Sequence, residues 1–497
     1  MATPLLLAID QGTSSTKCLL VDGEGAVVAR GSAPLGEQHP QPGWVDQDAK
    51  ALLASVRAAV ADCLRGQDPK AVAGIGISNQ RESLVAWDGK TGEPVAPLIS
   101  WQDQRSAAAV DALRTPELER LVQDRSGLPL DHMFSAAKAR WLLDALDPSR
   151  ARARAGAIRL GTVDSWLLWQ LAGGEHVVEA GNASRTQLLD VRRAAWDDDL
   201  LELFDVPREA LPRVVPSVGP FGHARGLAPL PDGVPILSVL GDSHSALFAH
   251  GGFRPGTVKA TFGTGSSVMG LIPEPGRLAE GLCLTIGWSL GSPAFAAEGN
   301  IRSAGATLRW MAELLGVPTE QLAELAATAS SEGVSVVPGF NGLGAPWWDR
   351  DAVGLITNCT LGTGRAQLAR AALESIVHQV ADVVEAVDRS VGRVAEVFAD
   401  GGPTRNAALM QLQADVLGRP VVPSRTAELS ALGVAHLAGL QAGIWTEASL
   451  AQLARDRTRY EAAWTEGERS SARARWHAAV RRARGLAVTA RAAEPTR

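Results

Sequence analysis

The stretch Leu5-Leu-Leu-Ala-Ile-Asp10-Gln-Gly-Thr-Ser-Ser-Thr-Lys17 decides the fold. An apolar run of strand length ends in an acid, and glycine and small hydroxyl residues follow at once. A second stretch, Thr261-Phe-Gly-Thr-Gly-Ser-Ser267, again places Gly-Thr and small hydroxyl residues directly after an apolar run. This internal similarity indicates a duplicated architecture, with a boundary near residue 250.

Outward from these stretches, short apolar runs alternate with longer amphipathic segments. The predicted strands are Leu5–Ile9, Cys18–Val21, Ala26–Ala29, Val72–Ile77, Ile236–Leu240, Val258–Phe262 and Val397–Ala399. The predicted helices are Ala51–Arg65, Ala136–Leu146, Ala304–Leu315, Ala366–Val391 and Ala407–Leu417. This alternation predicts an α/β protein with parallel sheets flanked by helices.

Three of the predicted strands run directly into an aspartate: Asp10, Asp242 and Asp400. Ligands of open α/β sheets bind outside the carboxyl ends of the strands, so acids at these ends are placed for chemistry. A single aspartate after a strand is more often a turn residue. Three of them beside glycines favour a functional site.

The two Gly-Thr segments are candidates for binding phosphate, because the sequence has no P-loop: Leu84 stands where the motif ending at Gly89-Lys90-Thr91 needs its first glycine. Glycine lets backbone N–H groups approach phosphate oxygens, and hydroxyls add further donors. Ordinary polar hairpins are an equally good interpretation of either segment alone. Asp10 is a candidate ligand for hydrated Mg²⁺, which takes few carboxylates and keeps its waters.

Arg81 and Glu82 follow the predicted strand Val72–Ile77. The cation can donate hydrogen bonds to one hydroxyl of a substrate, and the carboxylate can accept one from a neighbouring hydroxyl. A salt bridge at the strand end is the alternative.

Composition narrows the classes of function. The chain has 497 residues, enough for two or more domains, and 46% of them are hydrophobic. A net charge of −6 gives no reason to expect a nucleic-acid or membrane partner. No apolar run approaches the roughly 20 residues of a membrane span, and the first residues lack the basic segment of a signal peptide. The scattered cysteines predict core or near-core thiols rather than metal ligands. We therefore expect a cytoplasmic protein.

The chain resembles the FGGY family of carbohydrate kinases along nearly its whole length. The motifs that carry the resemblance are Ala8–Lys17, His39–Asp48, Gly76–Glu82, Gly161–Trp166, Asn182–Thr186, Gly241-Asp242, Gly263–Gly265, Gly342–Asp349, Asp400–Gly402 and Ala431–Ala435.

The resemblance implies two RNase H-like domains of the actin and hexokinase type, with an active-site cleft between them. It places an N-terminal domain at 1–250, a C-terminal nucleotide-binding domain at 251–445 and a helical tail at 446–497. The implied cofactors are ATP and Mg²⁺, and the implied activity is phosphorylation of a terminal hydroxyl of glycerol or a related polyol. A homodimer or homotetramer is expected.

The resemblance also assigns roles to particular residues. Asp242 is implied as the catalytic base, and Asp10 and Asp242 as metal-associated acids acting through water. The implied substrate-binding residues are Arg81, Glu82, Trp101, Met133, Asp242, Ser243 and Ser267. The implied nucleotide-binding residues are Gly12, Thr13, Ser14, Ser15, Lys17, Gly263, Thr264, Gly265, Gly305, Arg309, Gly401, Gly402 and Asn406.

Three of these positions depart from the members of the family that act on glycerol. Met133 stands in place of a tyrosine, Ser267 in place of an aromatic residue and Ser243 in place of a glutamine. Ser267 would leave room for one more hydroxymethyl group and offer it a donor and an acceptor, and Met133 could repack around a longer chain. A kinase for a C4–C5 polyol or ketose, of the erythritol, threitol or xylulose type, is therefore the alternative. A nucleotide-dependent sugar sensor or filament protein without catalysis is a less favoured one.

Overall fold

The computed structural model describes residues 4–253, 256–276 and 278–491. These residues divide into two compact units. Unit 1 comprises residues 1–253, 284–296 and 428–454, and unit 2 comprises residues 254–283, 297–427 and 455–497. The units are therefore not continuous in sequence, unlike the predicted ranges 1–250, 251–445 and 446–497. Residues 492–497 of the predicted tail lie outside the described residues.

Unit 1 is built around a five-stranded sheet in the order β13-β5-β1-β2-β3. Its strands are β1 (Leu5–Gln11), β2 (Ser15–Val21), β3 (Val27–Pro34), β5 (Val72–Asn79) and β13 (Ile236–Gly241). A four-stranded sheet contains β4 (Asp46–Gln47), β7 (Leu98–Ile99), β6 (Leu84–Asp88) and β8 (Ile158–Thr162). Two small ribbons pair β9 (Val177–Glu179) with β12 (Arg213–Val215) and β10 (Leu189–Asp190) with β11 (Ala195–Trp196).

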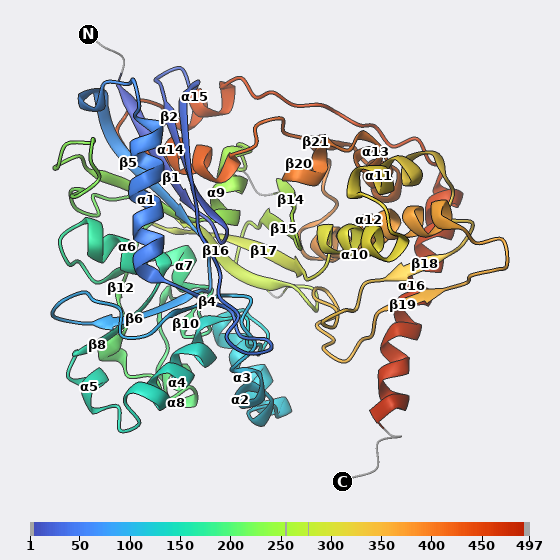
Figure 1. Ribbon diagram of the computed structural model, residues 1–497, viewed down its shortest axis with the longest axis horizontal. Helices are drawn as coiled ribbons and strands as arrows, with labels where there is room; N and C mark the ends of the chain where they lie inside the picture. The colour runs from blue at the N-terminus through green and yellow to red at the C-terminus, as the bar shows by residue number, and fades with distance from the viewer. Residues whose placement is uncertain (1–3, 254–255, 277, 492–497) are drawn as a thin grey trace. The chain divides into compact units, whose positions relative to one another are not determined.

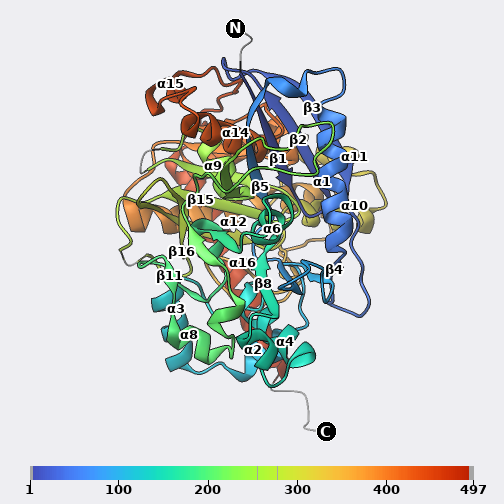
Figure 2. The same ribbon diagram turned by 90° about the vertical axis from the view of Figure 1, so that its left-hand side faces the viewer.

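The helices of unit 1 are α1 (Ala49–Cys63), α2 (Ala107–Ala112), α3 (Pro116–Ser126), α4 (Ser135–Leu146), α5 (Ala151–Arg154), α6 (Val163–Leu171), α7 (Ala180–Ala183), α8 (Asp198–Leu203), α9 (Asp242–Ala249), α14 (Leu429–Gln441) and α15 (Glu447–Gln452). Figure 1 shows α1 running along the strands of the five-stranded sheet, and Figure 2 shows α14 beside α9.

Helices cover both faces of this sheet because its strands are apolar on both sides. Ile75 and Ile77 of β5 belong to the same buried cluster as Val56 and Val60 of α1. The intervening Gly76 points to the opposite face. A Cβ there would lie 2.5 Å from the carbonyl oxygen of Val434 in α14, so glycine is needed for the close approach of helix and strand.

Unit 2 repeats this design. Its strands belong to a sheet of the order β16-β17-β15-β14-β20-β21, in which residues 284–296, most of β16 and the start of β17, are assigned to unit 1. The strands are β14 (Val258–Phe262), β15 (Ser266–Leu271), β16 (Cys283–Ser289), β17 (Pro293–Ile301), β20 (Val397–Asp400) and β21 (Val421–Pro423), and β18 (Ser335–Val337) pairs with β19 (Leu355–Thr357). The helices are α10 (Gly305–Leu315), α11 (Thr319–Thr328), α12 (Arg365–Val391), α13 (Ala407–Leu417) and α16 (Glu466–Arg491).

The expected α/β class is confirmed, but the sheets are mixed rather than parallel. In both units an antiparallel hairpin, β1–β2 or β14–β15, is extended on one side by parallel strands, β5 and β13 or β20 and β21. The reason is the short connection at residues 12–14 and 263–265, because parallel strands need a crossover of a dozen or more residues. The repeated hairpin with its parallel partners is the duplication that the two Gly-Thr stretches predicted.

The thiols follow the prediction with one exception. Cys18, Cys63 and Cys283 are buried, whereas Cys359 is exposed. No helix in the described ranges combines the length and the apolar character needed to cross a bilayer.

Candidate active site

The first Gly-Thr hairpin is held in place by its own backbone and by a neighbouring amide. The Gly12 N–H donates to the Ser15 carbonyl at 3.0 Å, and Gln47 Nε2 donates to the Thr13 carbonyl at 2.6 Å. Ser14 and Lys17 are exposed, while Gly12, Thr13 and Ser15 are half-buried. Their exposed polar groups make the hairpin a chemically suitable phosphate site.

Two of the three strand-end acids meet at one sheet edge. Asp10 in β1 and Asp242 at the start of α9 lie at the carboxyl ends of the parallel strands β1 and β13, on either side of β5. Asp10 is half-buried and accepts a hydrogen bond from Ser78 Oγ at 2.9 Å. Asp400, in contrast, pairs with Thr261 in the sheet of unit 2.

The electrostatics of Asp10 favour a bound cation. Burial raises the pKa of the Asp10 carboxyl to about 6, and the negative charge of Asp242 adds to this, whereas the Ser78 hydrogen bond and Lys17 act in the opposite direction. An acid that is hard to ionise alone becomes stable as a carboxylate when a cation lies next to it. Two hard carboxylates beside the first Gly-Thr hairpin suit Mg²⁺.

Arg81 lies against the predicted base. Its Nε is 3.2 Å from Asp242 Oδ1, and its Nη1 is 3.4 Å from His244 Nε2. The residue before the base has to be glycine, because a Cβ on Gly241 would lie 2.5 Å from Arg81 Cδ. The close approach of Arg81 therefore explains why a glycine precedes Asp242.

Glu82 adopts an unusual backbone conformation, and its carboxylate forms an ion pair with Arg185. Its φ is 60°, which is uncommon for a residue other than glycine. Ser135 Oγ donates to the Glu82 carbonyl at 2.9 Å, and Arg185 Nε lies 2.6 Å from Glu82 Oε1. A non-glycine residue held in the left-handed region is often part of a functional site.

Trp101, a predicted substrate-binding residue, is hydrogen-bonded to the first Gly-Thr hairpin. Its indole Nε1 donates to Thr13 Oγ1 at 3.1 Å, and its backbone N–H donates to Ser83 Oγ at 3.0 Å. Trp101 is therefore hydrogen-bonded both to the first hairpin and to Ser83, the residue after Glu82.

Met133 lies in a short segment whose carbonyl oxygens are hydrogen-bonded to the buried Lys138. Lys138 Nζ donates to the carbonyl oxygens of His132 at 2.8 Å, Met133 at 2.5 Å and Phe134 at 3.3 Å. Burial lowers the pKa of Lys138 to about 8. The backbone around Met133 is thus fixed by Lys138.

Ser430, the residue before the Ala431–Ala435 motif, supports the backbone of Asp242. Ser430 Oγ donates to the Asp242 carbonyl at 3.1 Å, and Ser245 Oγ donates to the Ser430 carbonyl at 2.5 Å. Helices α9 and α14 come this close because Gly433 has no Cβ, which would lie 1.9 Å from the Ser245 carbonyl. Ser243 is next to the base, and its backbone N–H lies 2.6 Å from Asp242 Oδ1.

In unit 2 the second hairpin packs against the start of α10. The N–H groups of Ala304 and Ala306 donate to the Thr264 carbonyl at 2.9 and 3.0 Å, and that of Gly305 to the Gly263 carbonyl at 2.9 Å. A Cβ on Gly265 would lie 2.4 Å from the Ile301 carbonyl and one on Gly305 would lie 2.6 Å from the Gly263 carbonyl.

The cationic side chain of Arg309 lies beside the second hairpin. Arg309 Nη2 is 3.4 Å from Thr264 Oγ1. Gly263, Thr264, Gly265, Gly305 and Arg309, which sequence alone predicted as nucleotide-binding, are therefore brought together.

Gly401, Gly402 and Asn406 follow β20, the neighbour of the hairpin strand β14. Gly401 has φ of 97° and could not carry a side chain, since a Cβ would lie 2.0 Å from the Phe262 carbonyl. A Cβ on Gly402 would meet nothing within 4 Å. Asn406 caps α13, with Oδ1 accepting from the Leu409 N–H at 3.1 Å, so it has a structural role as well.

The Ser267 hydroxyl was expected to offer a ligand both a donor and an acceptor, but its donor is used within the protein. Its hydroxyl donates to Glu298 Oε1 at 3.0 Å, and Glu298 is fully buried. The hydroxyl proton is therefore committed within unit 2, and only the oxygen lone pairs of Ser267 can serve a ligand.

The ionic cluster between α12 and α16 has the residue types of a metal centre, but an arginine fills it. Asp382, Glu385 and His477 have ligand atoms within 4.8 Å of one another. Arg473 Nη2 donates to Asp382 Oδ1 at 2.5 Å and to Glu385 Oε2 at 3.0 Å. This guanidinium supplies the positive charge itself, so the cluster attaches α16 to α12.

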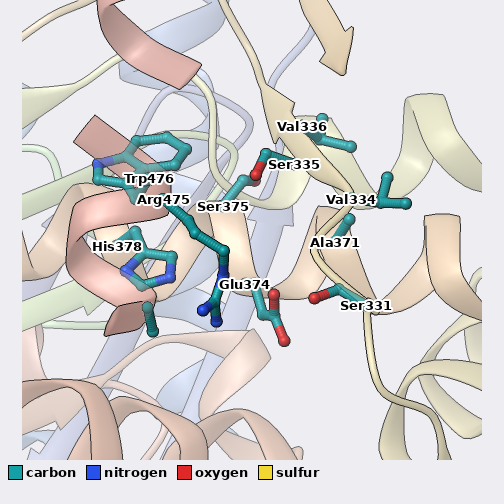
Figure 3. A pocket seen from close by; sticks show the side chains of 11 residues that line it. Ser331, Val334, Ser335, Val336, Ala371, Glu374, Ser375, His378, Arg475 and Trp476 are labelled. Atoms are coloured by element: carbon teal, nitrogen blue, oxygen red, sulfur yellow. The ribbon is translucent and has the colours of Figure 1, made fainter. Parts of the chain in front are cut away.

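The small cavity in Figure 3 lies beside this cluster and is too small for a sugar. Its volume is about 10 Å³, and His378, Trp476, Arg475 and Glu374 are among its lining residues. That is about the space of one water molecule. We therefore assign it to the packing of unit 2.

Glu179 is a buried carboxylate that is linked through Asn182 to the end of β5. Glu179 accepts hydrogen bonds from the N–H groups of Gly181 and Asn182 at 2.7 and 2.8 Å and from Ser217 Oγ at 2.5 Å. The Asn182 amide in turn bonds Asn79 at the end of β5. Burial raises the pKa of Glu179 to about 7, because its hydrogen bonds do not fully compensate for lost solvation.

This raised pKa predicts a pH dependence of stability. The folded protein holds the Glu179 proton up to about pH 7, whereas the unfolded chain releases it near its ordinary pKa of 4.5. The free energy of unfolding should therefore fall as pH rises through this window, and Glu179→Gln should reduce the slope by at most about 1.4 kcal/mol per pH unit. Urea unfolding between pH 4.5 and 7.5 measures both slopes; equal slopes would contradict the assignment.

Comparison with known proteins identifies the class. Residues 5–249 match the N-terminal domain, and residues 258–442 the C-terminal domain, of the FGGY family of carbohydrate kinases. The chain belongs to this family. It is a sugar or polyol kinase, and the kinases of this family use ATP.

The chain is similar in sequence to two kinases and in fold to a solved kinase structure. It is 45% identical to a glycerol kinase of Aromatoleum aromaticum, over 97% of this chain and 99% of that one. It is 43% identical to an apulose kinase of Pectobacterium atrosepticum, again over 97% and 99%. Its fold matches the crystal structure of Plasmodium falciparum glycerol kinase with ADP at a TM-score of 0.89 and 28% identity, covering 97% and 98% of the two chains.

Arg185 is a partner of Glu82 that sequence reasoning missed. Its motif, Asn182–Thr186, contributed to the family resemblance, but nothing in the sequence placed its cation next to Glu82. Residue type and spacing cannot reveal a contact between positions so far apart in the chain.

Proposed function

We propose that the protein transfers the γ-phosphoryl group of ATP to a terminal hydroxyl of glycerol or a closely related small polyol. The observation that carries this proposal is the position of Arg81, 3.2 Å from Asp242 and next in sequence to Glu82. A hydroxyl-binding pair and a proton acceptor are thereby adjacent, as phosphorylation of a polyol requires.

In this proposal Arg81 donates to one hydroxyl of the acceptor and Glu82 accepts from the next, with Trp101 as an apolar wall for the carbon chain. The terminal hydroxyl oxygen forms a bond to the γ-phosphorus while the bond from that phosphorus to the β–γ bridging oxygen of ATP breaks. The hydroxyl proton passes to a carboxylate oxygen of Asp242, and ADP leaves.

Mg²⁺ fits the residues present, because Asp10 is a half-buried acid with a raised pKa at the hairpin edge. Asp10 and Asp242 would hold the ion through water, and the bound ion would neutralise phosphate charge. The groups that would contact nucleotide phosphates are the two Gly-Thr hairpins and the Gly401-Gly402 turn. In domain terms, residues 1–250 would bind the acceptor and residues 251–445 the nucleotide.

A second acceptor class is supported by particular residues. Met133, Ser243 and Ser267 depart from the glycerol-acting pattern, and one relative at 43% identity is an apulose kinase. A C4–C5 polyol or ketose, of the erythritol, threitol, xylulose or apulose type, is therefore the second candidate acceptor. A pocket that loses one methylene of substrate forfeits only roughly 1–3 kcal/mol, so glycerol can remain a substrate in either case.

A panel of C3 to C5 polyols and ketoses tests both candidates. Acceptor-dependent ADP release is measured for each compound at saturating Mg²⁺-ATP. Phosphorylation of a panel compound is the expected result, and the order of kcat/KM values identifies the acceptor class. A chain that binds ATP but phosphorylates no panel compound would contradict the proposal. A cytoplasmic location and a homodimer or homotetramer remain predictions, and light scattering after size exclusion tests the latter.

Ser267→Phe is expected to shift preference toward glycerol, because a ring would occupy the space proposed for an extra hydroxymethyl group. The Glu298 bond complicates this variant, since phenylalanine also removes the donor at 3.0 Å. Ser267→Ala is the matched control: it removes the same donor without adding a ring. A ratio of glycerol to C4–C5 kcat/KM that rises in Ser267→Phe and not in Ser267→Ala supports the prediction. A hundredfold preference of the parent for glycerol would refute the enlarged pocket.

A further inference from the structure

We propose that Arg185 is a positioning residue that sets the Glu82 carboxylate for hydroxyl binding; this rests on the proposed function. Arg185 Nε lies 2.6 Å from Glu82 Oε1, and the side chain of Arg185 is fully buried. A cation with no exposed surface is not available as a contact for an incoming acceptor. It acts through the carboxylate beside it.

The backbone of Glu82 is fixed without Arg185, but the side chain is not. The left-handed φ of 60° and the hydrogen bond from Ser135 Oγ define where the Cα and carbonyl lie. Beyond the Cβ, a glutamate has freely rotating torsions that those two contacts leave open. An arginine at 2.6 Å restricts these torsions, because a charge-assisted bond depends on direction as well as distance.

Arg185 is itself held by packing on several sides. Its guanidinium carbon lies 5.1 Å from the centre of the Phe134 ring, at a distance that suits a cation–π contact. On either side of it, Ser184 Oγ is 2.7 Å from Thr285 Oγ1, and the Thr186 carbonyl accepts from the Ala136 N–H at 2.8 Å. A long side chain with its charge and both chain neighbours fixed transmits a defined orientation to Glu82.

Arg185 also supplies the positive charge that offsets the burial of the Glu82 carboxylate, which is only 5% exposed. Removal of Arg185 should therefore weaken acceptor binding, because the carboxylate loses both its partner and its orientation.

The test is a double-mutant cycle with Arg185→Ala, Glu82→Ala and both together, assayed with the best acceptor of the panel. Arg185→Ala should raise the acceptor KM by about tenfold or more, the size expected for disturbing a bond to a charged group, and leave the KM for ATP within about twofold. In the Glu82→Ala background the same change should add less than about twofold, because Arg185 then has no carboxylate to position.

Two further variants separate positioning from folding. Arg150 is 2% exposed and pairs with Asp205 at 2.9 Å in the same unit, so Arg150→Ala is the matched loss of a buried arginine. It should lower the melting temperature without changing the acceptor KM. If Arg185→Ala does not fold, Arg185→Lys keeps the positive charge, and its acceptor KM should be raised less than in Glu82→Ala.

The two Michaelis constants give an independent readout. In Arg185→Ala, or in Arg185→Lys if only that variant folds, the KM for the acceptor should rise more than the KM for ATP. Additive effects in the cycle, or equal changes of the two KM values, would overturn the positioning role. A parent chain that phosphorylates no panel compound, and whose melting temperature none of them raises, would instead overturn the proposed function, together with the role of Arg185 in it.

Discussion

Replacement of Asp242 by asparagine is expected to lower kcat by about 10²–10⁴-fold, the range of general-base contributions, while ATP binding persists. Asparagine keeps the size of the side chain and still places an oxygen or nitrogen near Arg81 Nε, which lies 3.2 Å from Asp242 Oδ1. It cannot take the hydroxyl proton. Stopped-assay turnover and calorimetric titration with ATP measure the two quantities.

A matched change elsewhere in unit 1 controls for the loss of one negative charge. Asp124 is exposed, and Asp124→Asn should leave both turnover and ATP affinity unchanged. Turnover of Asp242→Asn within a few-fold of the parent would exclude Asp242 as the proton acceptor. A parallel loss of ATP affinity would indicate instead that Asp242 serves mainly to bind the metal–nucleotide complex.

The sequence predicted the elements well because their periodicities are local. Strand Val258–Phe262 and helix Ala407–Leu417 have the predicted bounds, and the other predicted segments lie within a few residues of observed elements. Direction of pairing was predicted less well. The connection at residues 12–14 is too short for a crossover, so β1 and β2 are antiparallel, yet the alternation of strand and helix suggested parallel neighbours.

The site shows the same division between local and distant information. Asp10 and Asp242 were predicted at strand ends because each follows an apolar run, but the same reasoning applied to Asp400, which lies in the other sheet. The partners of Glu82 could not be predicted, since Arg185 and Ser135 reach it from other elements. The bond from Ser267 to Glu298 was hidden for the same reason: nothing near Ser267 in sequence shows that a buried carboxylate faces it.

Replacement of Glu82 by alanine is the second large effect expected. A hydrogen bond between a substrate hydroxyl and a carboxylate contributes roughly 1.5–3 kcal/mol, so the acceptor KM should rise by roughly 10- to 150-fold. The affinity for ATP should stay nearly unchanged, because the residues predicted to hold phosphate lie on the Gly-Thr hairpins. Steady-state kinetics with each substrate varied in turn measures both constants.

Stability alone does not test this role, because Glu82→Ala also leaves the buried Arg185 without its carboxylate. A lower melting temperature is therefore expected whether or not Glu82 binds substrate. Glu202 is exposed in the same unit, and Glu202→Ala should leave both the KM and the melting temperature as they are in the parent. The acceptor KM decides between the two interpretations. If Glu82→Ala lowers the melting temperature and its acceptor KM equals that of the parent, then Glu82 serves only as the ion-pair partner of Arg185, and the hydroxyls must be bound by other residues.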